Sequence, residues 1–327
     1  MYAPQPLLPV ISEHYALNAA QASWLISAVT LGVAVGVIPL GAASARMGRG
    51  RMIVVGLAIA TVAGLALGLV SPWWMLVTAR FIQGVGIAGV LVSAMAWVVD
   101  NVAPHAVTRV GGLYIAGTTI GGMGGRLFAG ALTDLFDSWQ WGLIISSAAL
   151  AVLGGIAHLL LPHAEVREVR QIPAGVADPG ARERRAMYLI GLVSMAVHGG
   201  VYNAAAFRGA AAPFELGPGA ISLLFLAYAA GTVTSTLAGR GAARFPIRTI
   251  QLAGLAAAGT GIVLSLVPQL WALLLGLILL SGGFFAVHAL ANSTAARLSP
   301  QPSAGAARYN LSYYVGASAG ALGFAFA

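Results

Sequence analysis

Long apolar stretches, separated by short polar connections, run through the whole chain. An α-helix needs about 20 apolar residues to cross the hydrocarbon core of a bilayer, so each stretch predicts a membrane-spanning helix. Glycine is frequent inside the stretches, as membrane helices allow. The ten predicted spans are 21–45, 52–71, 74–99, 110–133, 139–162, 187–208, 219–238, 249–267, 270–295 and 309–327, and a shorter apolar piece covers 2–12.

The composition points to the lipid bilayer as the solvent. Apolar residues make up 59% of the 327 residues and charged residues only 8%. With the 43 glycines the apolar share is about 70%, against about 45–50% in soluble domains. We therefore expect an all-α membrane protein. The chain has no cysteine, which excludes disulfides, thiolate metal sites and cysteine nucleophiles.

Arginine carries all the side-chain positive charge, and it alternates between connections. Every second connection holds arginines, namely Arg46, Arg49, Arg51, Arg109, Arg167, Arg170, Arg182, Arg184, Arg185, Arg240, Arg244, Arg248, Arg297 and Arg308. The other connections hold none, apart from Arg208 at the border of one. Cytoplasmic loops carry the excess of basic residues, so the first set is predicted to face the cytoplasm of a cell inner (plasma) membrane. We expect no nucleic-acid partner, because no solvent-sized domain presents the arginines.

The two halves of the chain are similar in sequence. Residues 41–57 align with 239–255 at an offset of 198, and residues 114–125 align with 313–324 at an offset of 199. An even number of spans separates the copies, which predicts two six-helix units that run parallel.

The offset also predicts how the chain divides. We expect an N-terminal half over 1–162, a charged cytoplasmic linker over 163–186, and a C-terminal half over 187–327. By the same offset, helix 1 would begin before Met1 and helix 12 would lie beyond Ala327. The expected fold is therefore two six-helix pseudo-repeats with about ten full helices, a remnant of helix 1 and no helix 12.

The connection after 21–45 resembles a motif of the major facilitator superfamily. "GAASARMGRGR" is similar to that family's Gly-x-Leu-Ala-Asp-Arg-x-Gly-Arg-Arg loop, with Gly41, Arg46, Gly48 and Arg49 in place and Ala45 at the aspartate position. The resemblance implies a loop that takes part in conformational change.

Two further motifs follow in the family's order. "RFIQGVG" resembles the Arg-x-x-Gln-Gly motif of the family's fourth helix, at Arg80, Gln83 and Gly84. "GTTIGGMGGR" resembles the fifth-helix motif of proton-coupled antiporters, at Gly117, Gly121 and Gly125, with Gly122 at the proline position and Arg126 at the last glycine position. Together the three motifs imply a transporter of the bacterial twelve-helix type, similar to drug or organic-solute efflux proteins.

Two short patterns imitate enzymes. Gly84, Gly86 and Gly89 have the spacing of a dinucleotide fingerprint, but they lie inside a span without a βαβ unit and are better suited to close helix packing. "GASAG" imitates a nucleophile elbow around Ser318, yet no acid or histidine follows it. We expect no enzymatic activity, no cofactor and no metal site.

Polar and ionisable groups inside spans are costly, which makes them candidates for substrate binding or coupling. In the resembled family the first, fourth, seventh and tenth helices line a central cavity, and Gln5 falls on the first of them. The candidates are Arg80, Gln83, Arg126, His198, Tyr202, His288 and Asn292. His198 with Tyr202 and His288 with Asn292 are spaced i,i+4, so each pair shares a helix face.

Each candidate also has a structural explanation. Arg80 and Arg126 lie about 9 Å from the outer ends of their spans and could extend their side chains to the interface. Each histidine could be a neutral imidazole hydrogen-bonded to a neighbour. The glycines at 117, 121 and 125 favour helix packing over ligand contact.

The resemblance implies a secondary active transporter that moves a small organic solute by alternating access, as proton-coupled efflux and as a monomer. Glu13, Asp100, Asp134, Asp137 and Glu215 all fall at span ends or in loops, so either helix 1 or a histidine would carry the proton. Unpaired positive groups favour an anionic or neutral solute. The alternatives are an organic-anion uniporter or importer, and a truncated membrane protein that transports nothing.

Overall fold

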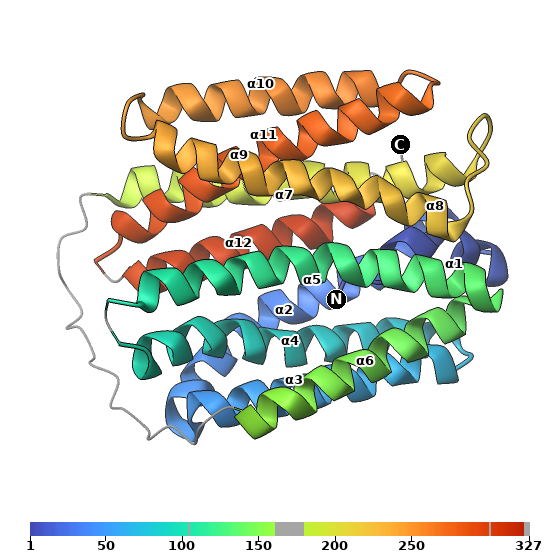
Figure 1. Ribbon diagram of the computed structural model, residues 1–327, viewed down its shortest axis with the longest axis horizontal. Helices are drawn as coiled ribbons and strands as arrows, with labels where there is room; N and C mark the ends of the chain where they lie inside the picture. The colour runs from blue at the N-terminus through green and yellow to red at the C-terminus, as the bar shows by residue number, and fades with distance from the viewer. Residues whose placement is uncertain (104, 161–179, 301, 324–327) are drawn as a thin grey trace.

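The computed structural model describes residues 1–103, 105–160, 180–300 and 302–323, and within these ranges it is a bundle of helices (Figure 1). The N-terminal part contains η1 (Gln5–Leu7), α1 (Leu8–His14), α2 (Ala19–Met47), α3 (Arg49–Leu69), α4 (Trp73–Asn101), α5 (Val107–Phe136) and α6 (Trp139–Leu160). The C-terminal part contains α7 (Ala181–Ala210), α8 (Pro218–Leu223), η2 (Leu224–Ala227), α9 (Tyr228–Gly241), α10 (Ile247–Ser265), α11 (Leu270–Arg297) and α12 (Pro302–Gly323).

Each of the ten predicted spans corresponds to helix within the described residues, although α3 ends at Leu69 and α10 at Ser265, two residues before the predicted ends. The piece at 2–12 contributes to η1 and α1. The span 219–238 tightens into a 3₁₀ segment at η2, but its backbone stays helical from Leu223 to Tyr228. The first helix of the C-terminal half begins at Ala181 rather than near 187, because the apolar pattern marks the membrane crossing and not the helix end. The predicted linker lies mostly outside the described residues, so the domain boundaries stay a prediction.

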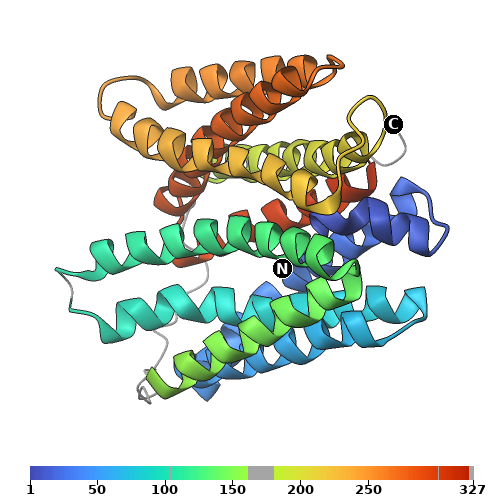
Figure 2. The same cartoon turned by 45° about the vertical axis from the view of Figure 1, so that its right-hand side comes forward.

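The helices pack as two groups with corresponding neighbours (Figure 2). In the N-terminal group α4 packs on α2 and α3, and α6 packs on α3 and α5. In the C-terminal group α11 packs on α9 and α10, and α12 packs on α7. The groups meet along α2 with α12 and along α5 with α8. This arrangement confirms the predicted fold of two helical pseudo-repeats.

Glycines bring corresponding helix pairs into backbone contact. A Cβ atom at Gly56 would lie 2.5 Å from the carbonyl oxygen of Gly86, and one at Gly254 would lie 2.9 Å from that of Gly283. Gly86 also packs on the backbone of α3, while Gly89 faces Met52. The predicted role of Gly86 and Gly89 in close helix packing is confirmed.

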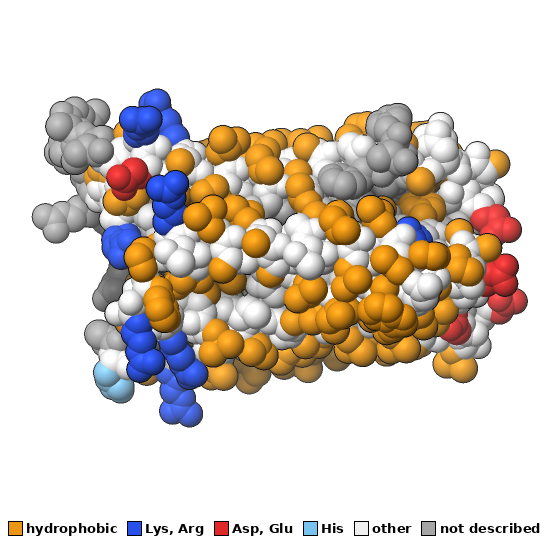
Figure 3. Space-filling view, turned by 90° about the horizontal axis from the view of Figure 1, so that it is seen from above, with side chains coloured by type: hydrophobic (Ala, Val, Ile, Leu, Met, Phe, Trp, Pro, Cys, Tyr) orange, Lys and Arg blue, Asp and Glu red, His pale blue; other side chains and the backbone are white. Residues whose placement is uncertain are grey.

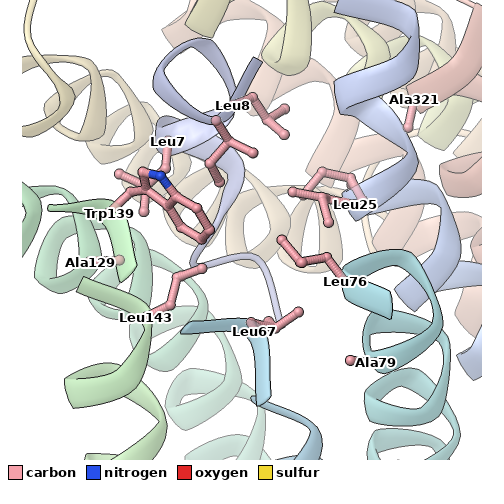
Figure 4. Packing of buried hydrophobic residues seen from close by; sticks show 12 residues of the cluster. Leu7, Leu8, Leu25, Leu67, Leu76, Ala79, Ala129, Trp139, Leu143 and Ala321 are labelled. Carbon is pink, nitrogen blue, oxygen red and sulfur yellow. The ribbon is translucent and has the colours of Figure 1, made fainter. Parts of the chain in front are cut away.

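A buried apolar cluster closes one end of the N-terminal group (Figure 4). Leu7 and Leu8 insert among side chains from α2, α3, α4 and α6, with Trp139 beside them. The short segment η1–α1 is therefore held by hydrophobic packing at the end where α2 begins.

Apolar side chains cover the middle of the outer surface and charged side chains the ends. Figure 3 shows arginines gathered at one end of the molecule and most of the visible carboxylates at the other. Eight of the described spans are long and apolar enough to cross a membrane, and the glycine-rich α5 and α12 are not among them. Exposed large residues such as Val62 and Val263 lie on the outer faces of their helices, as expected for a surface in contact with lipid.

Candidate functional site

Arg126 lies in an aromatic cage between the two groups of helices. Its guanidinium carbon is 4.6 Å from the ring centre of Tyr2, 4.8 Å from that of Phe225 and 4.7 Å from that of Tyr228. The side chain projects from α5 and is 2% exposed, and its Nη1 donates to the carbonyl oxygen of Gly122 at 2.8 Å. Desolvated cation–π contacts stabilise a buried cation by about 2 kcal/mol or more. Among the described residues no carboxylate pairs with Arg126.

A glutamine and an asparagine continue the site across the interface. Arg126 Nε donates to Gln5 Oε1 at 2.9 Å, and Gln5 Nε2 donates to Asn203 Oδ1 at 2.7 Å. Gln5 and Asn203 are 198 residues apart, so they occupy equivalent positions in the two repeats and meet where the halves meet. Asn203 Nδ2 is buried without a hydrogen-bond partner in the described structure. Sequence reasoning missed Asn203, although the repeat offset applied to Gln5 points to it.

His198 and Tyr202 of α7 lie next to the cage, as their shared helix face predicts. The His198 ring stacks on Phe284 at 4.0 Å and meets the Tyr228 ring edge-on at 5.1 Å. Tyr202 Oη is 2.7 Å from Ser281 Oγ, which is 3.5 Å from His198 Nε2. His198 Nδ1 is buried without a partner in the described structure. Tyr228 therefore touches both Arg126 and His198 and joins them into one site.

His288 and Asn292 lie further along α11, toward its C-terminal end. The His288 ring stacks on Phe284 at 5.7 Å, one helical turn further along, and its Nδ1 is 3.0 Å from Tyr309 Oη. Asn292 Oδ1 has no partner among the described residues. Both histidines stack on the Phe284 ring, which connects them within the site.

Arg80 and Gln83 do not join this site. Arg80 is 1% exposed, and its three guanidinium nitrogens donate to three oxygens: Nε to Leu25 O at 2.7 Å, Nη2 to Met1 O at 2.6 Å, and Nη1 to Gln83 Oε1. Gln83 Nε2 donates in turn to Ala60 O of α3 at 3.1 Å. The Arg80 side chain therefore does not extend to the membrane–water interface. Together with Gln83, it holds α2, α3 and α4 together inside the N-terminal group.

Comparison with known proteins decides the family. The sequence profile of the Major Facilitator Superfamily matches residues 1–321. The chain belongs to the major facilitator superfamily.

Two relatives at moderate identity cover nearly all of the chain, and a third matches less than half of it. The inner membrane transport protein YnfM of Escherichia coli (strain K12) is 30% identical over 344 residues, covering 100% of this chain and 80% of YnfM. An uncharacterized transporter of Buchnera aphidicola subsp. Schizaphis graminum is 27% identical and covers 90% of this chain and 72% of its own length. The multidrug resistance protein Stp of Mycobacterium tuberculosis (strain CDC 1551 / Oshkosh) is 31% identical over 136 residues, 41% of this chain and 25% of Stp.

Two solved structures share the fold. A bacterial homolog of the human lysosomal transporter Spinster, in an inward-facing and unoccupied conformation, superposes with a TM-score of 0.79 at 20% identity, over 99% of this chain and 77% of the homolog. A mutant form of the nucleoside transporter NupG superposes with a TM-score of 0.73 at 14% identity, over 98% of this chain and 85% of NupG. The superfamily and the transporter relatives make this chain a membrane transport protein.

The superfamily loop between α2 and α3 has a defined geometry. Gly48 has a φ of 93°, which only glycine adopts without strain, and this lets α3 begin directly after α2. Arg49 Nε lies 3.5 Å from Asp100 Oδ2 of α4, so an ion pair links the loop to a neighbouring helix although Ala45 replaces the motif's aspartate. Arg46 is exposed, and no described atom lies within 4 Å of a Cβ built on Gly41.

The fifth-helix glycines do not form the expected packing seam. Apart from the backbone of α5 itself, no described atom lies within 4 Å of a Cβ built on Gly117, Gly121 or Gly125. The equivalent glycines of α12 behave differently, because a Cβ on Gly316 or Gly320 would meet the carbonyl oxygens of α7. The expectation failed because glycine spacing shows where a helix could approach and not whether one does.

Hydrogen bonds join the two groups on the side where α2 begins. Ser27 Oγ donates to Ser318 O at 2.9 Å and Ser318 Oγ donates to Ser27 O at 3.0 Å, which joins α2 to α12. Asp134 Oδ2 of α5 accepts from the backbone N–H of Gly219 of α8 at 3.0 Å. The arginine pattern predicts that this is the outer side, where both inter-group contacts would lie between the site and the outside.

Proposed function

We propose that this protein is a secondary active transporter that moves a small organic solute across the cell inner membrane by alternating access of its two halves. The site around Arg126 carries this proposal. Its residues come from both repeats, so opening and closing the halves against each other would expose it first to one side and then to the other. The seal at Ser27–Ser318 and Asp134–Gly219 supplies contacts that such a cycle would break.

The chemistry of the site favours an anionic or neutral solute. Arg126 has only neutral partners among the described residues, and Gln5 Oε1 occupies the position that a carboxylate or carbonyl of a solute could take. Asn203 Nδ2 and His198 Nδ1 are polar atoms beside it without partners in the described structure, available to a ligand. Aromatic rings around them would contact the apolar part of an organic molecule. A cationic solute would be repelled by the guanidinium.

Export coupled to proton entry is the mode that we propose. The partial antiporter motif in α5 and the similarity of part of the chain to Stp support it. Every acid within the described helices lies near a helix end, so His198 is the proton carrier that we propose. Arg80 and Gln83 would position the N-terminal helices and not contact the solute. A single chain contains both halves, so a monomer suffices.

Transport can be tested in inside-out membrane vesicles that carry an acidic-interior pH gradient reported by a fluorescent amine dye. A panel of monocarboxylates and neutral organic solutes is added, and proton-coupled export returns fluorescence because protons leave as solute enters the vesicle. Solute uptake without any fluorescence change would instead support a uniporter or importer. The absence of both would support a protein that transports nothing.

Two substitutions at Tyr228 supply a matched control. Tyr228→Phe keeps the ring 4.7 Å from Arg126 and removes only the 3.4 Å contact from Nη2 to the hydroxyl. Tyr228→Leu removes the ring from both Arg126 and His198. We expect transport by Tyr228→Phe within about threefold of wild type and a loss of about tenfold or more in Tyr228→Leu, as one desolvated cation–π contact implies. Equal transport by both variants would show that the cage has no part in the cycle.

A further inference from the structure

An apolar groove of about 400 Å³ lies between α9 and α10, on the outside of the C-terminal half. Ala230, Thr234 and Leu237 of α9 form one wall, Ala253 and Ala257 of α10 form the other, and α11 forms the floor. The groove is separate from the site around Arg126, because it opens between two peripheral helices that make few contacts with each other.

The lining of the groove suits an apolar occupant. Thr234 supplies the side-chain hydroxyl in the lining, and its Oγ1 already donates to Gly282 O at 2.8 Å. A polar ligand would therefore find no free side-chain partner in the lining.

The length and position of the groove match one leaflet of the bilayer. From Ala230 to Gly241 the wall of α9 extends over about 16 Å, at 1.5 Å per residue. The hydrocarbon core is about 30 Å thick, so one leaflet is about half of that. The groove ends at Phe245, in the connection that the arginine pattern places at the cytoplasmic surface.

Three arginines surround that end of the groove. Arg240 lies in the last turn of α9, Arg244 in the connection and Arg248 in the first turn of α10, and all three side chains are exposed. None of them pairs with a carboxylate of the described residues. Figure 3 shows how arginines gather at this end of the molecule. Clusters of basic residues beside a membrane surface attract anionic lipid head groups.

The corresponding positions of the N-terminal half carry larger side chains. At the offset of 198, Leu40 replaces Ala238 and Ile59 replaces Ala257. Leu40 packs against the core of α2 and α4, and Ile59 Cγ2 would lie 3.0 Å from a Cβ on Gly86. Small side chains leave the groove open in one half, and larger ones occupy the corresponding positions in the other.

We propose that this groove binds one acyl chain of an anionic glycerophospholipid from the cytoplasmic leaflet, with the head group held by Arg240, Arg244 and Arg248. The apolar lining, the length of one leaflet and the exposed arginines at one end together specify this occupant.

The test is native mass spectrometry of the detergent-purified chain titrated with phosphatidylglycerol or phosphatidylcholine of the same acyl chains. We expect wild type to bind phosphatidylglycerol at least about 25-fold more tightly than phosphatidylcholine. The double variant Arg240→Gln/Arg244→Gln should lose about 25-fold for phosphatidylglycerol and little for phosphatidylcholine, because each arginine near an anionic lipid contributes a factor of about five. The matched control Arg46→Gln/Arg51→Gln removes the same charge from the N-terminal loop and should leave both affinities unchanged.

A second pair of variants tests the groove itself. Ala257→Leu fills it and should weaken both lipids, whereas Ala256→Leu on the same helix, outside the lining, should weaken neither. Equal effects of the two arginine pairs would overturn the proposal, since they would indicate only general surface charge. Unchanged lipid binding by Ala257→Leu would also overturn the proposal. If that variant changed from dimer to monomer while lipid binding stayed intact, the occupant of the groove would be a second copy of the chain.

Discussion

Replacing Arg80 by lysine tests whether a buried arginine sets the geometry of the N-terminal helices. In the structure its three nitrogens point to three different oxygens, two on the backbone and one on Gln83. A lysine has one nitrogen at the end of a flexible chain and cannot donate along all three directions. At least one oxygen would therefore lose its charged donor.

The size of the effect follows from the hydrogen bonds that are lost. A hydrogen bond from a charged donor contributes about 1.5–3 kcal/mol, and a buried acceptor left without a donor adds a further cost. If one such bond is needed to hold α2 on α4 during the cycle, the barrier rises by at least about 1.4 kcal/mol, which corresponds to about tenfold in rate. We therefore expect Arg80→Lys to lower the transport rate at least about tenfold while the protein still inserts into the membrane.

The assay compares transport in inside-out vesicles at equal protein level, measured by immunoblot, together with the thermal unfolding midpoint in detergent. Arg208→Lys is the control, because Arg208 Nη2 donates to Leu266 O at 2.8 Å from a half-buried position near the end of α7. Its replacement should change neither quantity appreciably. Normal transport by Arg80→Lys, with Arg80→Ala absent from the membrane, would refute this reasoning and leave Arg80 as an anchor only.

Three further outcomes are expected. Cysteines introduced as Ser71→Cys and Gly217→Cys should react with an impermeant maleimide from outside, and Ala243→Cys only from inside. The labelling is specific because the chain has no cysteine of its own. Reaction of Ser71→Cys and Ala243→Cys from the same side would contradict the predicted topology. Gly320→Leu should lower the unfolding midpoint by several degrees, because a Cβ at this position meets Ala196 O. Gly121→Leu, at the equivalent position of α5, has open space and should leave the midpoint nearly unchanged. Equal shifts of the midpoint in both variants would count against this packing. Gly130→Leu should push α5 away from α8, because a Cβ on Gly130 would lie 2.6 Å from Ser222 Cβ, and should make a cysteine introduced as Ser318→Cys reactive from outside. The control Gly259→Leu, where a Cβ has open space, should leave that cysteine unreactive. An unreactive cysteine in both variants would show that the contact between α5 and α8 does not close the outer side.

The helices themselves could be predicted because their signals are local. A run of about 20 apolar residues is sufficient evidence for a span, and the arginines between runs indicate orientation. The repeat offset of 198 predicted the pairing of Gly56 with Gly254, and both glycines contact the equivalent helix in their own half. The 22-residue α12 begins before its apolar run, because a helix can extend beyond the membrane that the run marks.

The candidate site depended on how each helix is rotated and which helix lies beside it, and these properties are not local. His198 and Tyr202 were predicted to share a face, but their partners Ser281 and Phe284 come from α11. Arg80 and Arg126 looked alike in sequence, each an arginine inside an apolar span. The fold gave one of them backbone carbonyls within its own half and the other a cage of rings from both halves. Gly117 and Gly121 of α5 share a pattern with Gly316 and Gly320 of α12. Only the α12 pair has a helix against it, because contact depends on what the rest of the chain places there and not on the glycines alone.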